Sequence, residues 1–251
     1  MSVNQISCPN RENAVKVCSE YLGKTWLLFD PEMKARVDAQ KNDWKTFFQQ
    51  VHERSWGQRK PAGEYGKIFA QESMTVRRYY PTGDNRHPAI WKVTIGPDAF
   101  FVKQTSQYGI STNIGMDHAA PIQYLSLVAL SFVHTPPVRA AKPCFAFLGE
   151  RSSFLVTEFV EGRNMANRMD ANDKEKLAAF KKERVRMYGY RFKDIRDANL
   201  LKTNDGELVL ADPLDMKYCL MEKGDQWKFD SQKTARAIEE RGGWLDASFF
   251  R

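Results

Sequence analysis

Cysteine and histidine are scarce in this sequence, and the few that are present are scattered. Among 251 residues there are four cysteines and four histidines, and none of them form a Cys-x-x-Cys pair or a group at zinc-ligand spacing. A Gly-x-Ser-x-Gly turn is also missing. These absences argue against a disulfide framework, a zinc enzyme and a serine hydrolase, and they favour a reducing cytoplasm as the location.

Long apolar runs are missing as well. The longest, from Tyr124 to Val133, includes serines and falls short of the roughly 20 residues that a membrane helix needs. The first residues contain no basic segment followed by an apolar stretch, so a signal peptide is not expected. We therefore expect a cytoplasmic protein with no membrane partner.

Positive charge is in excess, with 38 Lys and Arg residues against 31 Asp and Glu residues and a net charge of +7. Such an excess favours phosphate-bearing or acidic partners. Basic runs at Arg77-Arg78 and 181–186 could contact nucleic acid, but no base-stacking aromatic motif accompanies them. We therefore do not expect nucleic acid as a partner. The 42% of hydrophobic residues is typical of a globular protein.

Residues 1–62 are predicted to form a helical N-terminal extension. The segment Asp30-Pro31-Glu32 is a strong helix start, because it joins an N-cap acid, a proline at the first position and a further acid. An apolar stripe at helical spacing follows it through Glu53. The residues of this stripe are Met33, Val37, Trp44, Phe48 and Val51. We expect the stripe to brace the main domain, and a partner-binding helix is the alternative.

From about Tyr65 the pattern changes to β-strands, two of which form a hairpin with a turn at 96–98. A nearly apolar segment, 117–133, is long enough for a buried helix, and a second helix is expected from Asn172 or Asp173 to about Tyr190. The strands are expected at 73–80, 89–94, 99–104, 143–148, 153–160, 199–202 and 207–211. The last two are joined by a hairpin turn at 203–206. This mixture predicts an α+β protein.

The polar residues near these strands can supply every group that phosphoryl transfer from ATP requires. Such a site needs a cation for the α/β-phosphates, oxygen ligands for Mg²⁺ and a carboxylate facing the accepting hydroxyl. Alternation along 99–104 places Phe101 and Lys103 on one face, pointing into a cleft under the sheet. Asp194 and Asn199 lie five positions apart, and Asp212 follows at a strand end. An edge-strand lysine and solvated turn acids are the plain structural alternatives.

The segment from Arg191 to Leu201, with its Asp-x-x-x-x-Asn spacing, resembles the catalytic loop of protein kinases, and Asp212 resembles their downstream metal aspartate. The segment from Ser153 to Gly162 is similar to their fifth strand and hinge. This resemblance implies a bilobal protein kinase-like fold. It implies a β-rich N-lobe over 63–161 that ends in the hinge and an abbreviated C-lobe over 162–251.

The resemblance also implies residue roles, with ATP and Mg²⁺ as cofactors. Asp194 would orient the accepting hydroxyl or act as base, and Arg196 would neutralise the transferring phosphoryl group. Lys103 would hold the α/β-phosphates, and Asn199 and Asp212 would ligate Mg²⁺. At the adenine, the gatekeeper would be Thr157, and the backbone groups would come from Glu158 and Val160.

The sequence departs from the kinase pattern at several points. The segment 80–88 contains one glycine instead of a glycine-rich loop, and Asp117 is the only acid between Gln104 and Phe147. Either Asp117 or an acid from elsewhere would pair with Lys103. Pro213 follows Asp212 and would lock its pose. With its short C-terminal part, the chain resembles the kinases of short-tailed bacteriophages and the minimal effector kinases of bacterial pathogens, which would place it in a host cytoplasm.

These features predict an atypical minimal protein kinase that phosphorylates Ser/Thr hydroxyls. Ser/Thr specificity is inferred only from Arg196, which takes the place of a lysine in Ser/Thr kinases. The protein substrate is not given by the sequence, and the protein itself is a possible acceptor. A pseudokinase that acts as a binding module or inhibitor is the alternative, favoured by the missing glycine loop and helix glutamate. A small-molecule phosphotransferase of the aminoglycoside-kinase type would need a larger helical substrate lobe.

Overall fold

The structure is a computed structural model of the whole chain. It describes residues 26–29, 33–53, 64–70, 73–80, 90–106, 120, 123–124, 127, 130, 137–148, 152–188, 195–211 and 244–246.

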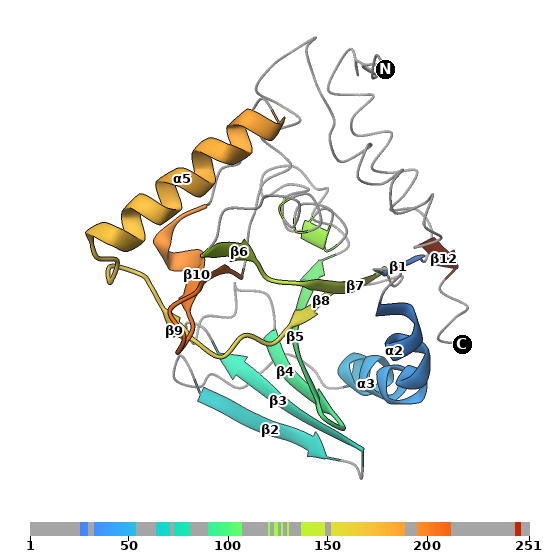
Figure 1. The fold of residues 1–251 in the computed structure, drawn as a ribbon. Coiled ribbons are helices and arrows are strands. Elements are labelled where there is room, and N and C mark those ends of the chain that lie inside the picture. The colour runs from blue at the N-terminus through green and yellow to red at the C-terminus, as the bar shows by residue number, and fades with distance from the viewer. Residues whose placement is uncertain are drawn as a thin grey trace, which may run out of the picture.

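A large sheet of eight antiparallel strands dominates the described residues (Figure 1). Its strands, in spatial order, are β12 (Trp244–Asp246), β1 (Trp26–Phe29), β7 (Pro143–Leu148), β8 (Ser152–Glu158), β5 (Asp98–Ser106), β4 (Ile90–Ile95), β3 (Met74–Tyr80) and β2 (Glu64–Ala70). The predicted hairpin between β4 and β5 is confirmed. Its turn contains Gly96 at φ 55°, a left-handed conformation that suits glycine.

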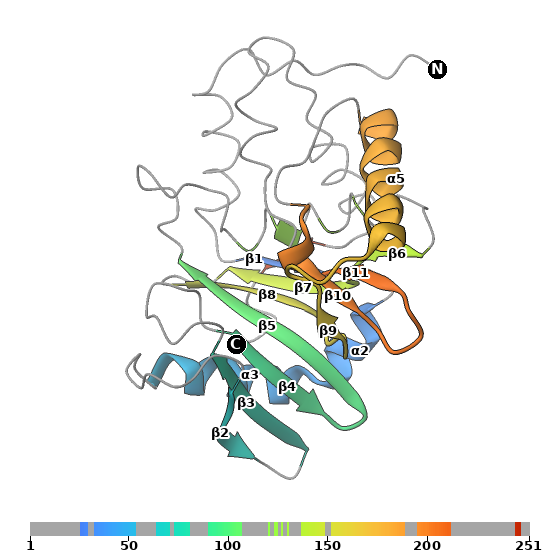
Figure 2. The ribbon, with the colours of Figure 1, turned by 90° about the vertical axis from the view of Figure 1, so that its left-hand side faces the viewer.

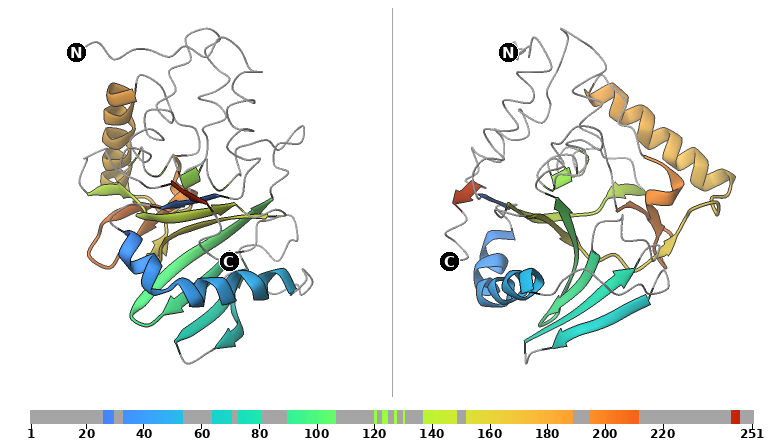
Figure 3. Two further views of the ribbon diagram at one scale, coloured as in Figure 1. Left: turned by 90° about the vertical axis from the view of Figure 1, so that its right-hand side faces the viewer. Right: turned by 180° about the vertical axis from the view of Figure 1, so that it is seen from behind.

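Two helices cover one face of this sheet, as Figures 2 and 3 show from three directions. They are α2 (Lys34–Ala39) and α3 (Lys41–Glu53). Trp44 of α3 is fully buried, and its ring centroid lies 4.8 Å from that of Phe145 and 5.1 Å from that of Phe100. The side chain of Gln40 donates a 2.7 Å hydrogen bond to Asp98 at the start of β5. The prediction that the apolar stripe braces the main domain is therefore confirmed.

The prediction that residues 1–62 are helical is wrong at Trp26–Phe29. These residues form β1, which pairs with β7 on one side and with β12 on the other. Four consecutive apolar residues have no periodicity that separates strand from helix, and aromatic residues favour strands. The hydrogen-bonding backbone groups of β7 make this segment a strand. Trp26–Phe29 therefore belong to the same sheet as the strands that follow them.

A second sheet has the spatial order β6-β11-β10-β9. Its strands are β6 (Val138–Ala140), β11 (Leu208–Leu210), β10 (Leu200–Lys202) and β9 (Arg163–Asn164). The strands β11 and β6 are parallel, and the other pairs are antiparallel. The predicted β10–β11 hairpin is confirmed, with Gly206 at φ 86° in its turn. Helix and antiparallel sheet together confirm the α+β class.

The helix α5 (Ala171–Tyr188) lies beside this smaller sheet, on the side of the large sheet away from α2 and α3 (Figures 1 and 2). Its N-terminus was expected at Asn172 or Asp173. The cap is instead Asp170, whose Oδ1 accepts the backbone N–H of Asp173 at 2.7 Å. None of the described helices is both long and apolar enough to cross a membrane.

Candidate active site

Lys103 lies in β5, near the centre of the large sheet, with only 3% of its surface exposed. Its register neighbours are Ile90 on β4 and Leu155 on β8. The adjacent Val102 belongs to the core cluster that packs against α3. Because side chains alternate along a strand, Lys103 lies on the opposite face of the sheet, together with Phe101. This agrees with the predicted alternation.

The predicted adenine-binding residues lie at the end of β8 and in the segment after it, which leads to β9 of the smaller sheet. The backbone N–H of Glu158 donates to the carbonyl of Lys142 at 2.9 Å, and that of Phe159 donates to Ala99 at 3.0 Å. The Thr157 hydroxyl donates to the carbonyl of Glu158 at 3.1 Å. The N–H of Val160, in contrast, has no hydrogen-bond acceptor among the described residues. Val160 is also partly exposed.

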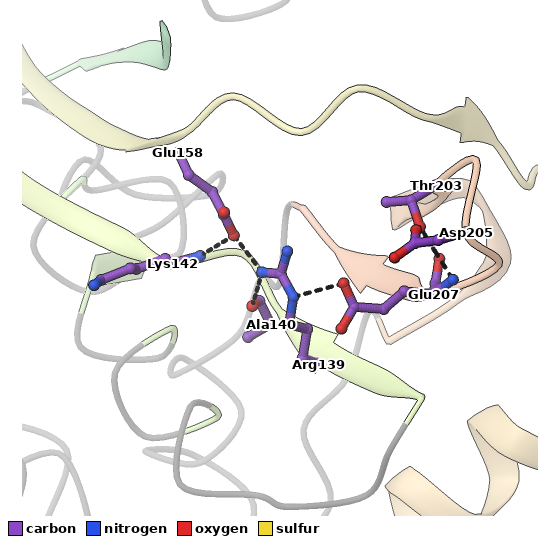
Figure 4. Close-up of polar contacts among 7 residues, drawn as sticks. All are labelled: Arg139, Ala140, Lys142, Glu158, Thr203, Asp205 and Glu207. Atoms are coloured by element: carbon purple, nitrogen blue, oxygen red, sulfur yellow. Dashed lines mark hydrogen bonds and ion pairs between the residues drawn. The ribbon is translucent and has the colours of Figure 1, made fainter. Parts of the chain in front are cut away.

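The side chain of Glu158 is held by Arg139 of β6, as Figure 4 shows. The same guanidinium donates through Nε to Glu207 at 2.9 Å, just before β11. Glu158 also accepts the backbone N–H of Lys142 at 2.7 Å. Burial disfavours the charge on Arg139, but the hydrogen bonds and attraction of both glutamates outweigh it and raise the pKa of Arg139 above its ordinary value. Arg139 thus ties the end of β8 to the smaller sheet.

The predicted catalytic segment contains one turn of 3₁₀ helix, η3 (Asp197–Asn199), which leads directly into β10. The N–H of Asn199 donates to the carbonyl of Arg196 at 3.0 Å. The carbonyl of Asn199 accepts the N–H of Ala211 at 2.9 Å, and Ala211 immediately precedes Asp212 in the sequence. The Arg196 side chain is exposed. The predicted site residues Asp194 and Asp212 themselves lie outside the described residues.

The loop that follows β9 supports the η3 turn. The Asp197 carboxylate accepts the backbone N–H groups of Asn167 and Ala198, each at 2.9 Å. These hydrogen bonds, led by the one from Asn167, lower the pKa of Asp197 below its ordinary value. The Asn164 side chain donates to the carbonyl of Ala198 at 2.9 Å. β9 and the loop that follows it therefore hold η3 through both side-chain and backbone groups.

A close backbone approach also brings Gly162, the residue before β9, to β10. A Cβ atom at Gly162 would lie 2.9 Å from the Lys202 carbonyl oxygen, which is closer than real side chains come. The Nζ of Lys202 contacts both carboxylate oxygens of the buried Asp173, at 2.8 and 2.9 Å. This ion pair fixes α5 to β10. Together these contacts position β10, and with it Asn199, relative to α5 and the loop.

The observed contacts join the two groups of predicted site residues through a continuous path. Glu158 contacts Arg139, Arg139 contacts Glu207, and β11 runs from there to Ala211, which contacts Asn199. Sequence reasoning did not find Arg139 or the role of Asp197. The strand that contains Arg139 has only three residues and follows two prolines, so it is too short to show an alternating pattern. The role of Arg139 therefore could not be predicted from the sequence. The Asn164 and Asn167 side chains were detectable as turn formers beside Gly162.

Within the described residues, no three His, Cys, Asp or Glu side chains are grouped as a metal site. The predicted metal ligands would be one amide oxygen, from Asn199, and one carboxylate, from Asp212. Such a small donor set suits Mg²⁺, which keeps waters and phosphate oxygens among its ligands.

No protein-family model and no curated protein match the sequence. Among solved structures, the chain is similar to that of Rad53 1–466 in complex with AMP-PNP, with 18% sequence identity and a TM-score of 0.35. The similarity covers 66% of this chain and 42% of the Rad53 chain, so this chain spans about two fifths of that length.

Proposed function

We propose that the protein is an ATP-dependent, Mg²⁺-requiring phosphotransferase of the protein kinase type, which transfers phosphate to Ser/Thr hydroxyls of a protein. The observation that carries this proposal is the burial of Lys103 in a central strand, on the sheet face opposite to α3. Burying an ammonium group is costly unless anionic or strongly accepting groups lie close to it. Lys103 already interacts within the protein, and the α/β-phosphates of bound ATP would be a further anionic partner on this face.

The end of β8 and the connector that follows it are suited to hold the adenine. A purine edge needs one donor and one acceptor from the protein. The Val160 N–H is an available donor, because no hydrogen-bond acceptor for it lies among the described residues. The Glu158 carbonyl is the acceptor, since a carbonyl oxygen has two lone pairs and the Thr157 hydroxyl uses one. In this proposal Thr157 is the gatekeeper beside the base.

Asn199 and Asp212 would hold Mg²⁺, which when bound neutralises charge on the phosphates. The hydrogen bond between Ala211 and Asn199 supports this assignment, because Asp212 follows Ala211 directly. Asp194 would orient the accepting hydroxyl or take its proton. Arg196 is exposed and could offset the charge of the transferring group. The support of η3 by Asp197 keeps this segment in place.

The proposal extends to domain organisation. Residues 63–161 would be the N-lobe with its hinge, and 162–251 an abbreviated C-lobe. The spatial order β3-β4-β5-β8-β7, in which the lysine lies on the third of these five strands in sequence, supports this assignment, and β2 adds a further strand at the edge beside β3. Residues 1–62 would be an extension whose strand and helices complete the N-lobe. The proposed relationship to phage and effector kinases rests on the sequence alone.

One observation favours the pseudokinase alternative. The helical residues described between β5 and β6 are all buried. Among them, the first polar residue after Lys103 in sequence is Gln123, which is uncharged. A kinase would place a glutamate on this helix to pair with the lysine. A nucleotide-binding module without transfer activity would not need that glutamate.

Incubation of the protein with γ-labelled ATP and Mg²⁺, alone and with a generic protein substrate, tests the proposal. We expect label on protein for the wild type, and none for Asp194→Asn or Asp212→Asn. Asp205→Asn is the matched control, because Asp205 lies in the β10–β11 turn and, among the described residues, its hydrogen bonds stay within that turn. ATP binding without transfer by the wild type would establish the pseudokinase alternative, and failure to bind ATP would overturn both.

A further inference from the structure

We propose that three exposed cations beside η3, Arg168, Lys181 and Arg196, bind an acidic segment of the protein substrate, so that Ser/Thr hydroxyls flanked by Asp or Glu are preferred. This inference rests on the proposed function and deepens it, because it names the substrate class of the same site. The three cations come from the loop after β9, from α5 and from the segment that leads into η3.

The junction between η3 and the loop after β9 brings two arginines to one place in the fold. The hydrogen bond from the Asn167 backbone N–H to the Asp197 carboxylate joins two segments that are 30 residues apart. Arg168 directly follows Asn167, Arg196 directly precedes Asp197, and both arginines are exposed. The backbone N–H of Arg168 donates to the carbonyl of Met165 at 2.9 Å, so its backbone belongs to a hydrogen-bonded turn.

The third cation, Lys181 of α5, lies within reach of the charge on Asp197. Desolvation lowers the pKa of Lys181 below its ordinary value, the charge of Arg184 lowers it further, and the carboxylate of Asp197 opposes the shift. The ammonium group is nevertheless exposed at the surface. An exposed lysine with a lowered pKa lies where positive charge exceeds negative charge, and a bound anion would correct that excess.

The acids of this region are already engaged within the protein. The Asp197 carboxylate accepts two backbone N–H groups. Asp170, in the loop after β9, caps α5 and lies 4.0 Å from Lys202. Among the described residues, neither Arg168 nor Lys181 forms an ion pair, whereas Lys202 contacts a buried carboxylate at 2.8 Å. The cations at the junction are therefore available to carboxylates from outside.

The place of the junction favours a protein substrate as the source of these carboxylates. Asp194, which would orient the accepting hydroxyl, lies two residues before Arg196 in the sequence. A substrate whose hydroxyl reaches Asp194 would bring the residues beside that hydroxyl to the junction. A compact group of three cations suits a short acidic stretch better than the long row of phosphates in a nucleic acid. The net charge of +7 adds attraction at longer range.

Two peptides test this inference, each with a single serine that is flanked by glutamates in one and by glutamines in the other. Fluorescence anisotropy would measure their binding, and labelled ATP their phosphorylation. The wild type should prefer the glutamate peptide, and the preference should shrink as the salt concentration rises. Arg168→Ala and Lys181→Met should each weaken the glutamate peptide roughly 2- to 5-fold, the usual effect of one exposed ion pair, and leave the glutamine peptide unchanged.

Two further variants separate charge from structure. Lys182→Met is the matched control, because Lys182 is exposed on the same helix but lies about 200° around it from the buried Phe180. It should bind the glutamate peptide as the wild type does. Arg168→Lys keeps the charge and should retain most of the binding. In phosphorylation assays, the losses in Arg168→Ala should appear in KM for the glutamate peptide, with kcat unchanged.

The outcomes are distinguishable from those of the proposed function. If the wild type binds both peptides equally, or if Arg168→Ala and Lys181→Met bind the glutamate peptide as the wild type does, the inference is wrong even if phosphate transfer is found. If these cations bind the glutamate peptide but no phosphate is transferred, the acidic-segment site stands and the transfer activity fails. If short duplex DNA binds through the same cations more tightly than the glutamate peptide, a nucleic acid is the partner and the inference is overturned.

Discussion

The backbone N–H of Ala211 donates a 2.9 Å hydrogen bond to the carbonyl oxygen of Asn199. This bond extends the β10–β11 ladder by one step beyond the pair of Leu200 and Leu210. Its consequence is that the residue before Asp212 is fixed beside Asn199. In the proposed function, Asn199 and Asp212 would supply the two protein oxygens for a cation with few protein ligands.

The first prediction concerns Mg²⁺. Replacing Asn199 by Ala removes an oxygen ligand, and we expect it to raise the Mg²⁺ concentration for half-maximal activity or nucleotide-dependent thermal stabilisation by roughly 10-fold or more. Asn199→Asp keeps an oxygen ligand and should raise the required Mg²⁺ concentration less than Asn199→Ala does. Asn204→Ala, in the exposed turn of the same hairpin, should behave as the wild type. Equal Mg²⁺ dependence in all variants would show that Asn199 is not a metal ligand.

The second prediction concerns the ion pairs of Arg139. Arg139→Met leaves Glu158 and Glu207 without their shared cation, and these groups are about one-third exposed, so solvent weakens each interaction. We expect a loss of roughly 1–2 kcal/mol in the free energy of unfolding, measured by urea denaturation.

A combined variant tests whether this loss comes from the charges. Adding Glu158→Gln and Glu207→Gln to Arg139→Met removes the two carboxylates that the arginine had neutralised, and should recover part of the lost stability. The contrary outcome is a loss of unfolding free energy in the triple variant that equals the sum of the losses in the three single variants. In that case the three side chains act independently, and the link between the two sheets is not electrostatic.

The third prediction concerns the brace formed by α3. Trp44 is completely buried against Phe100 and Phe145, so Trp44→Ala should cost roughly 3–5 kcal/mol of unfolding free energy. Gln49→Ala, on the exposed side of the same helix, should cost little. If Trp44→Ala is tolerated as well as Gln49→Ala, α3 is not part of the core of the sheet.

Strong periodic signals in the sequence predicted much of what the structure contains. The spacing from Met33 to Phe48 predicted the brace, and the alternation around Lys103 predicted which face it occupies. Both predictions depend on a pattern that repeats over several residues. Side chains point in regular directions in helices and strands, so such a pattern determines directly which residues are buried. The β4–β5 and β10–β11 hairpins were predicted for a similar reason, because their turns contain glycine.

What the sequence did not predict depends on partners that are far away along the chain. Trp26–Phe29 became a strand because β7 offers an open edge, more than a hundred residues later. Asp170 rather than Asn172 or Asp173 caps α5, because Asp173 is taken by Lys202 on β10. Arg139 acquires its role only when the ends of β8 and β11 come together. None of these pairings produces a repeating pattern in the sequence.

The last prediction is a pH dependence centred on Asp197. The hydrogen bonds from Asn167 and Ala198 favour the charged carboxylate and lower its pKa below the ordinary 3.8. A depressed pKa means that this support is fully present above pH 3.8 and is lost as the pH falls through the folded-state pKa. The amide NMR signals of Asn167 and Ala198 should therefore titrate together, with a midpoint below 3.8.

The amide of Ala166 provides an internal control for this titration, because it bonds to the neutral side chain of Asn164 at 2.9 Å. Its signal should not follow the same midpoint. In Asp197→Asn the titration of the Asn167 and Ala198 signals should disappear, since the amide that replaces the carboxylate carries no titrating proton. A midpoint at or above 3.8, or a titration that survives in Asp197→Asn, would show that another group holds the loop against η3.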